Sequence, residues 1–96
     1  MVQKIVTLKT TPEDARQTGT IDSLIIVDDD PGTPHAILHN RPEPWIVTFT
    51  EEYEYVLILK SHFPDATQVT VNVGEQKIVF EKQSNNYFGG LRHIHL

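Results

Sequence analysis

Histidines are the residues of this 96-residue chain whose types and spacing could do chemistry. In an extended strand His35 and His39 point to one face, and so do His93 and His95, because side chains alternate between the faces. If the two strands were neighbours, four imidazoles would converge. Imidazole is a natural ligand of zinc and other divalent transition metals, and the chain has no cysteine to supply thiolate. One hypothesis is therefore a metal-binding protein, or a small metal-dependent hydrolase or nuclease, that uses these four histidines.

Three consecutive aspartates stand in the stretch DDDPG. Any of Asp28, Asp29 and Asp30 could complete a histidine site with a carboxylate. Oxygens of Asp28 and Asp30 could also contact Ca²⁺, but Ca²⁺ takes six to eight oxygens and no glutamate stands at the spacing that closes an EF-hand loop. An acidic turn at the end of a strand is the interpretation that we favour.

Catalytic motifs give no further support for an enzyme. The Gly89–Gly90 pair lacks the Lys-Ser/Thr successor of a phosphate-binding loop. No serine stands in the context of a nucleophile elbow. We predict no catalytic residue, and a non-enzymatic protein is the favoured hypothesis.

Acidic side chains concentrate in the first half of the chain. Residues 1–54 carry ten acidic and four basic side chains, whereas residues 55–96 carry three and four. Binding to nucleic acid needs clustered lysine and arginine, so the composition argues against it. An acidic surface suits a basic partner protein, and we predict that Glu51, Glu52 and Glu54 contribute to such a surface.

Four further residues are candidates for partner binding. Trp45 follows a proline-rich stretch, Tyr87 and Phe88 stand in an Asn/Gly-rich one, and Arg92 supplies a polar anchor. Aromatic side chains on loops make good interface anchors because they bury a large area at a small cost in entropy. The alternative is that Trp45 and Phe88 fill the core.

These features predict a small acidic protein-interaction module, acting as an inhibitor, adaptor or accessory subunit of the kind that phages and mobile elements encode. The last residues, LRHIHL, are expected to form a strand at a sheet edge. Such a strand could pair with that of a second copy and form a homodimer. The chain length predicts a single domain over residues 1–96.

A cytoplasmic location is expected. The chain has no run of about 18 apolar residues that could span a membrane. Its first residues, MVQKIVTLKT, do not form the apolar region of a signal peptide.

Alternating and β-branched residues predict most of the chain as strands. The expected strands are 2–9, 20–27, 35–39, 45–50, 66–73, 77–83 and 91–96, with one or two helical turns over 10–19 and a loop over 84–90. The clearest element is the hairpin of 66–73 and 77–83, which Gly74–Glu75 joins.

The segment 51–63, EEYEYVLILKSHF, fits both a helix and a strand. Thirteen residues are long for a strand, the acids suit a helix N-terminus and Pro64 gives a stop, so we predict a helix. The expected fold is therefore α+β: a mostly antiparallel sheet of about five to six strands covered by this one main helix. A ferredoxin-like arrangement is one version of it.

Overall fold

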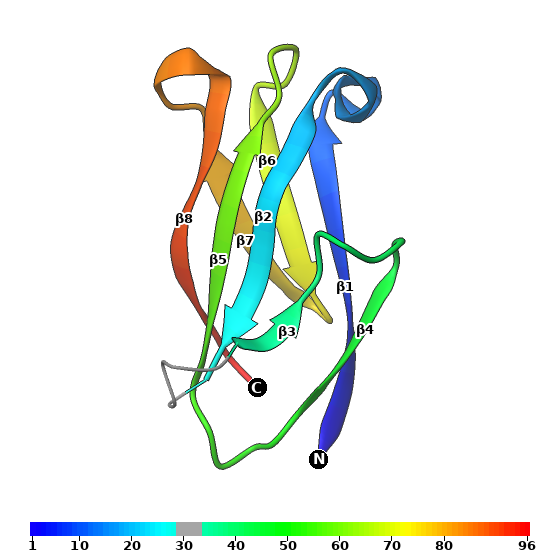
Figure 1. The fold of residues 1–96 in the computed structure, drawn as a ribbon, viewed down its shortest axis with the longest axis vertical. Coiled ribbons are helices and arrows are strands. Elements are labelled where there is room, and N and C mark those ends of the chain that lie inside the picture. The colour runs from blue at the N-terminus through cyan, green and yellow to red at the C-terminus, as the bar shows by residue number, and fades with distance from the viewer. Residues whose placement is uncertain (29–33) are drawn as a thin grey trace.

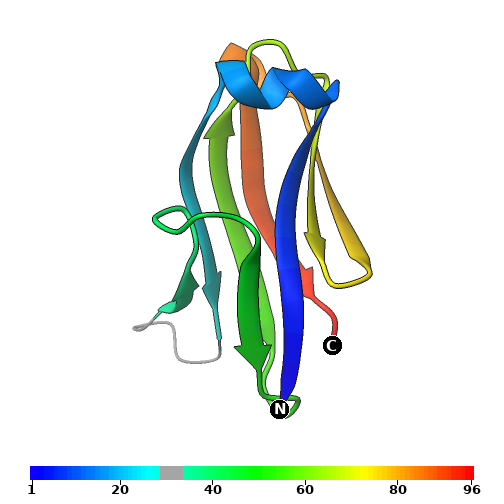
Figure 2. The ribbon, with the colours of Figure 1, turned by 90° about the vertical axis from the view of Figure 1, so that its right-hand side faces the viewer.

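The computed structural model describes residues 1–28 and 34–96, which form two layers of β-sheet (Figures 1 and 2). The strands are β1 (Val2–Thr11), β2 (Thr20–Val27), β3 (Pro34–Ile37), β4 (Trp45–Phe49), β5 (Tyr55–His62), β6 (Gln68–Val73), β7 (Gln76–Glu81) and β8 (Tyr87–Ile94). Two short 3-10 helices, η1 (Glu13–Thr18) and η2 (Ser84–Asn86), complete the described elements. Sheet A has the antiparallel order β4-β1-β6-β7, and sheet B has the antiparallel order β3-β2-β5-β8.

The predicted α+β fold with a main helix over 51–63 is wrong. Residues 55–62 form β5, which is hydrogen-bonded between β2 and β8 in the interior of sheet B. Residues 51–54 belong to the turn before it, so the strand has an ordinary length and the objection from length fails. Tyr55, Leu57 and Leu59 alternate into the core. Pairing on both sides thus decides the conformation of a segment whose local pattern fits either state.

The hydrophobic core lies between the two sheets, as in other sandwiches whose inner faces interdigitate. Inward positions of every strand contribute to it; β5 and β6 bury every second residue along their length, and β1 and β2 do so in their second halves. The largest fully buried side chains are Tyr55, Phe49, Phe63, Phe80, Phe88, Leu24, Ile26, Leu38, Leu57, Leu59, Val6 and Val69. Because both sheets supply these side chains, each sheet needs the other to bury its inner face.

Strand β1 is longer than its neighbour β4. The pairing of β1 with β4 ends at Val6, opposite Trp45, whereas its pairing with β6 continues to Thr11. Among the strands that the structure describes, the segment Thr7–Thr11 therefore has a neighbour on one side alone. We call this segment the free half of β1.

Two connections frame the free half of β1. Helix η1 crosses between the sheets at the end of β1 and leads into β2 (Figure 2). Residues 38–44 cross back from β3 in sheet B to β4 in sheet A, about halfway along the sandwich. In the described part of the chain, no strand covers the side of the sandwich between η1 and this crossing.

Several predicted elements match the structure. The strand over 20–27 is confirmed, and so is the hairpin of β6 and β7, in which Gly74 takes a φ of 60° at the turn. The loop predicted over 84–90 is wrong, because β8 already begins at Tyr87. In the described part of the chain, no helix is long and apolar enough to cross a membrane.

Candidate functional site

The two histidine pairs lie at opposite edges of sheet B. His35 is on β3 and His39 follows that strand, whereas His93 is on β8 and His95 follows it. Strands β2 and β5 lie between them, so the four imidazoles do not converge. Within residues 1–28 and 34–96, no group of three or more histidines, aspartates and glutamates is placed to hold a metal ion. Asp29 and Asp30 lie outside the described residues.

His35 and His39 make contacts that join parts of the sandwich. The Nε2 of His35 lies 2.6 Å from the carbonyl oxygen of Thr48. A carbonyl oxygen only accepts, so Nε2 is the donor of this hydrogen bond, which joins β3 to β4. The ring also packs against the rings of Phe49 and Tyr55, at 5.8 and 4.8 Å between centroids. Nδ1 of His39 accepts a hydrogen bond from the backbone N–H of Leu24 at 3.2 Å. Both imidazoles therefore have structural partners.

The backbone around His93 and His95 is bound by one glutamine of sheet A. The side-chain amide of Gln76 donates to the carbonyl of His93 at 3.1 Å and accepts from the N–H of His95 at 2.8 Å. The residues His93 and His95 are themselves exposed. The C-terminal histidines thus lie at the surface, where the strand is held through its main chain.

The free edge of β8 is covered at further points. The backbone N–H of Gln83 donates to the carbonyl of Tyr87 at 2.8 Å, and the side-chain amide of Gln83 donates to the carbonyl of Gly89 at 3.0 Å. The guanidinium of Arg92 lies 4.7 Å from the ring centroid of Phe80 on β7. Pairing of this strand with a second copy stays a prediction, and it would have to replace the bonds from the two glutamines.

The aromatic candidates for partner binding lie mostly inside the molecule. Trp45 is 3% exposed, and its Nε1–H donates to the carbonyl of Arg41 at 3.0 Å. Phe88 is fully buried. Tyr87 is half-buried, and its hydroxyl donates to the carbonyl of Leu59 at 3.3 Å. Their side chains therefore contribute to packing within the sandwich.

The acidic candidates Glu51, Glu52 and Glu54 lie at the surface, in the turn between β4 and β5. A carboxylate oxygen of Glu51 lies 3.9 Å from the N-terminal amine, with both groups largely exposed. This turn is at one end of the sandwich (Figure 1). It remains accessible to a basic partner.

The outer face of sheet B carries a row of aliphatic side chains that sequence reasoning missed. Four of them lie in register across all four strands: Ile37, Ile25, Ile58 and Leu91. Val27 and Val56 pair in the next row. Leu91 is 60% exposed, Ile37 is 40% exposed and the other four are half-buried. We call these six residues the aliphatic face.

The signal for the aliphatic face was present in the runs LIIV and VLIL of β2 and β5. Central strands that are apolar on both faces are typical of sheets that are covered on both faces. Here the core covers one face, and residues 1–28 and 34–96 form no second layer over the other. On the outer face of sheet A, by contrast, mostly polar residues surround the exposed pair Ile5 and Ile46.

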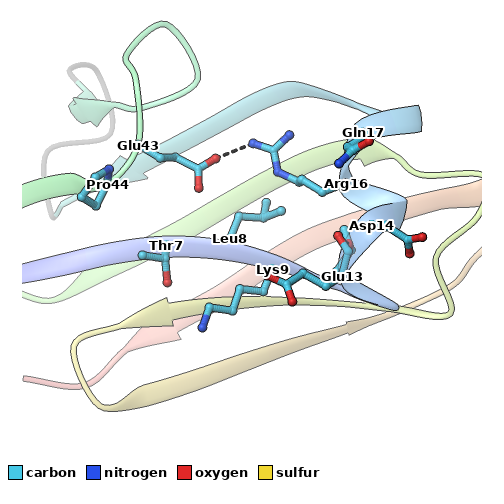
Figure 3. Close-up of a pocket in the computed structure, with 10 residues that line it drawn as sticks. Thr7, Leu8, Lys9, Glu13, Asp14, Arg16, Gln17, Glu43 and Pro44 are labelled. Carbon is cyan, nitrogen blue, oxygen red and sulfur yellow. Dashed lines mark hydrogen bonds and ion pairs between the residues drawn. The ribbon is translucent and has the colours of Figure 1, made fainter.

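A second candidate site is an open cavity of about 840 Å³ beside the free half of β1 (Figure 3). Its lining comes from β1, from η1 and from the crossing, and we call it the edge groove: Thr7, Leu8, Lys9, Thr10, Glu13, Asp14, Arg16, Gln17, Glu43 and Pro44. An ion pair between Arg16 and Glu43 joins η1 to the crossing (Figure 3). Leu8 lies beneath this pair in the view of the figure.

Main-chain groups of β1 point into the edge groove. The carbonyls of Ile5 and Thr11 accept bonds from Gly74 and Thr67, on the β6 side, at 2.9 and 2.7 Å. Backbone groups of an antiparallel strand alternate between its two neighbours, so those of Leu8 and Thr10 point to the other side. The pairing with β4 ends before both residues. The prolines of NRPEP gave a sequence signal for this, since proline interrupts a ladder.

Comparisons with models of protein families, with curated proteins and with solved structures find no match to this chain. Inference of a function therefore depends on the chemistry of the aliphatic face and of the edge groove.

Proposed function

We propose that the protein is a non-enzymatic protein-interaction module that associates with a second copy of itself through the aliphatic face. The single observation that carries this proposal is the row of Ile37, Ile25, Ile58 and Leu91 across the outer face of sheet B. Burial of apolar surface contributes roughly 25 cal/mol per Å². A contiguous row of four large aliphatic side chains is therefore a strong source of association free energy.

The charge distribution favours a second copy as the occupant. The chain has a net charge of −5, so two copies repel one another over most of their surface. The four strands of sheet B, however, contain a single acidic residue, Asp22. Its carboxylate oxygen Oδ2 lies 2.7 Å from Nδ1 of His62. Two copies can thus meet at sheet B without placing unpaired carboxylates opposite one another.

A dimer of this kind would use most of one broad side of the molecule. The molecule extends 38 Å along its longest axis and 23 and 21 Å along the other two, and a stable interface of standard size takes roughly 800 Å² from each partner. Homodimer interfaces are also more apolar than other protein surfaces.

In this arrangement the dimer leaves other surfaces available. The acidic turn with Glu51, Glu52 and Glu54 lies at the end of the sandwich, just beyond the row of Val27 and Val56. An inhibitor, adaptor or accessory subunit could present it to a basic partner. We propose the cytoplasm as the compartment, since the chain uses no cysteine.

Sedimentation equilibrium over low to high micromolar concentrations tests the self-association. We expect the wild type to reach twice its monomer mass of 11.0 kDa. Leu91→Lys places a charge in the row and is expected to keep the chain monomeric. Ile5→Lys is the matched control, because Ile5 is 55% exposed on the outer face of sheet A.

A wild type that stays monomeric throughout would overturn the proposal, and so would dissociation by Ile5→Lys to the same degree as by Leu91→Lys. Circular dichroism of each variant checks that the sandwich still folds. A dimer that only Leu91→Lys dissociates would support the proposal.

A further inference from the structure

We infer that the edge groove binds an extended peptide segment with basic side chains, which adds as a strand to the free half of β1. This inference concerns a different surface from the aliphatic face and does not depend on self-association. Strand addition at a sheet edge uses main-chain hydrogen bonds for affinity and side-chain pockets for specificity. The groove offers both.

Segments of two other strands, β8 and β2, are covered at their edges by other parts of the chain. The carbonyls of Tyr87, Gly89 and His93 on β8 accept bonds from Gln83 and Gln76. On β2, residues that follow β3 in the chain bind the backbone at the position where the pairing with β3 has ended. The carbonyl of Leu24 accepts the N–H of Leu38 at 2.8 Å, and the N–H of Leu24 binds His39.

The free half of β1 differs from these edges. The N–H and C=O groups of Leu8 and Thr10 point away from β6, and the strand that should face them begins only opposite Val6. The side-chain hydroxyl of Thr10 donates to the carbonyls of Pro12 and Glu13, so it does not pair with the backbone groups of Thr10. Unpaired strand edges are templates for another strand.

The groove has space for a short strand. The free half of β1 is five residues long, which corresponds to roughly 16 Å of extended chain. The cavity of about 840 Å³ runs along this segment. A ligand running antiparallel to β1 would take the place that β4 would occupy if it continued past Trp45.

The charges at the groove favour a basic segment. Glu13, Asp14 and Glu43 line it, against Lys9 and Arg16. Arg16 is paired with Glu43, and Lys9 extends from the opposite side of β1 from this pair (Figure 3). Glu13 and Asp14 therefore remain as carboxylates for a lysine or arginine of the ligand. The net charge of −5 also attracts a cationic segment.

The ion pair between Arg16 and Glu43 spans the groove without closing it permanently. Their side chains are 36% and 31% exposed, and exposed ion pairs contribute little to stability. An entering strand can therefore displace the pair.

Amide hydrogen exchange by NMR tests the inference at individual backbone groups. The probe is an acetylated and amidated hexapeptide of alternating lysine and valine. We expect the amides of Leu8 and Thr10 to exchange rapidly in the free protein and to slow by about tenfold or more with saturating peptide. The amide of Lys9 faces β6 and serves as the internal control, because it is already paired.

Two further peptides separate main-chain pairing from charge. A lysine–valine peptide with alternate backbone amides N-methylated is expected to give no protection, because it lacks the donors that pair with β1. A glutamate–valine peptide is expected to bind at least about threefold more weakly, as like charges at the groove oppose it.

Two protein variants test the carboxylates. Glu13→Gln and Asp14→Asn should each weaken the lysine peptide about two- to fivefold, the factor of an exposed ion pair. Glu75→Gln makes the same kind of change at the turn between β6 and β7 and should have no effect. All titrations are repeated in the Leu91→Lys background, so that loss of the dimer and loss of peptide binding are observed separately.

Three results would overturn the inference. The first is rapid exchange at Leu8 and Thr10 that neither unmethylated peptide slows. The second is equal protection by the N-methylated peptide. The third is slow exchange of both amides in the free protein, which would show that the edge is already paired.

Discussion

The two sheets of this sandwich divide their exposed surface in opposite ways. Sheet B has an aliphatic outer face, and segments of its edges on β2 and β8 are covered by side chains and by the crossing. Sheet A has a mostly polar outer face and leaves half of β1 without a neighbouring strand on one side. Sheet B is therefore suited to contact through side chains, and sheet A to contact through its main chain.

This difference has a simple physical origin. A face of a sheet interacts through the side chains at every second position of its strands, so its chemistry is set by which amino acids stand at those positions. An edge interacts through main-chain groups that every residue has, so its availability is set by where the neighbouring strand stops. The aliphatic face is a property of composition, whereas the edge groove is a property of strand lengths.

The largest expected effect separates the inner from the outer face of one strand. Leu59 of β5 is fully buried, and its neighbour Ile58 is a half-buried member of the aliphatic face. Leu59→Ala should lower the free energy of unfolding by about 2–5 kcal/mol, since it leaves a cavity in the core. Ile58→Ala should cost the monomer about 1 kcal/mol or less. Urea denaturation at low protein concentration measures both, and equal losses would contradict the assignment of the two faces.

The second prediction concerns substitutions that make the outer face of sheet B more polar, like that of sheet A. Ile25→Thr combined with Ile58→Thr should weaken the dimer about 100-fold or more, because two central aliphatic groups are lost from the interface. The monomer should stay folded, as β-branched threonine suits a strand. Sedimentation equilibrium measures the dimer, and the double variant Ile5→Thr with Ile46→Thr is the control. A control that weakens the dimer equally would remove the distinction between the faces.

The third prediction uncovers the edge of β8. Gln76→Ala removes the two hydrogen bonds that its side chain makes to the main chain of His93 and His95. The expected loss of stability is about 1 kcal/mol, small because both groups can bind water instead. The amide of His95 should also exchange faster. Gln3→Ala, at an exposed position of β1, is the control. Unchanged exchange at His95 would show that Gln76 does not cover this edge.

The smallest expected effect concerns the ion pair across the edge groove. Glu43→Gln should lower the free energy of unfolding by a few tenths to about 1 kcal/mol, because the pair is partly exposed. A double-mutant cycle with Arg16→Gln, followed by thermal denaturation at low and high salt, isolates the pairwise contribution. A coupling above about 2 kcal/mol would mean that the pair holds the groove closed, contrary to the proposed entry of a peptide.

Prediction from the sequence worked best where the spacing of apolar residues fits a strand and not a helix. The alternation of valines over 68–73 and the turn at Gly74 located the hairpin of β6 and β7. It failed over 51–63, because β5 is apolar on both faces and its pattern then resembles that of a buried helix. The same apolar character, once the segment is known to be a strand, identifies the aliphatic face.

The candidate site residues were harder to place. Trp45 and Phe88 looked like loop anchors because glycine, asparagine and proline surround them, yet both side chains are buried in the sandwich. Glu51, Glu52 and Glu54 do lie at the surface. Local composition predicts whether a segment bends, but burial depends on what the rest of the chain places against it.

The sequence by itself determined the alternation of the strands, the tight turn at Gly74 and the absence of thiolate chemistry. The tertiary structure alone decided which strands are neighbours. It separated the histidine pairs to opposite edges of sheet B, covered the edge of β8 with Gln76 and Gln83, and left Leu8 and Thr10 facing a groove. Alternation follows from backbone geometry within a few residues, whereas neighbours are selected by hydrogen bonds and core packing between segments far apart in the chain.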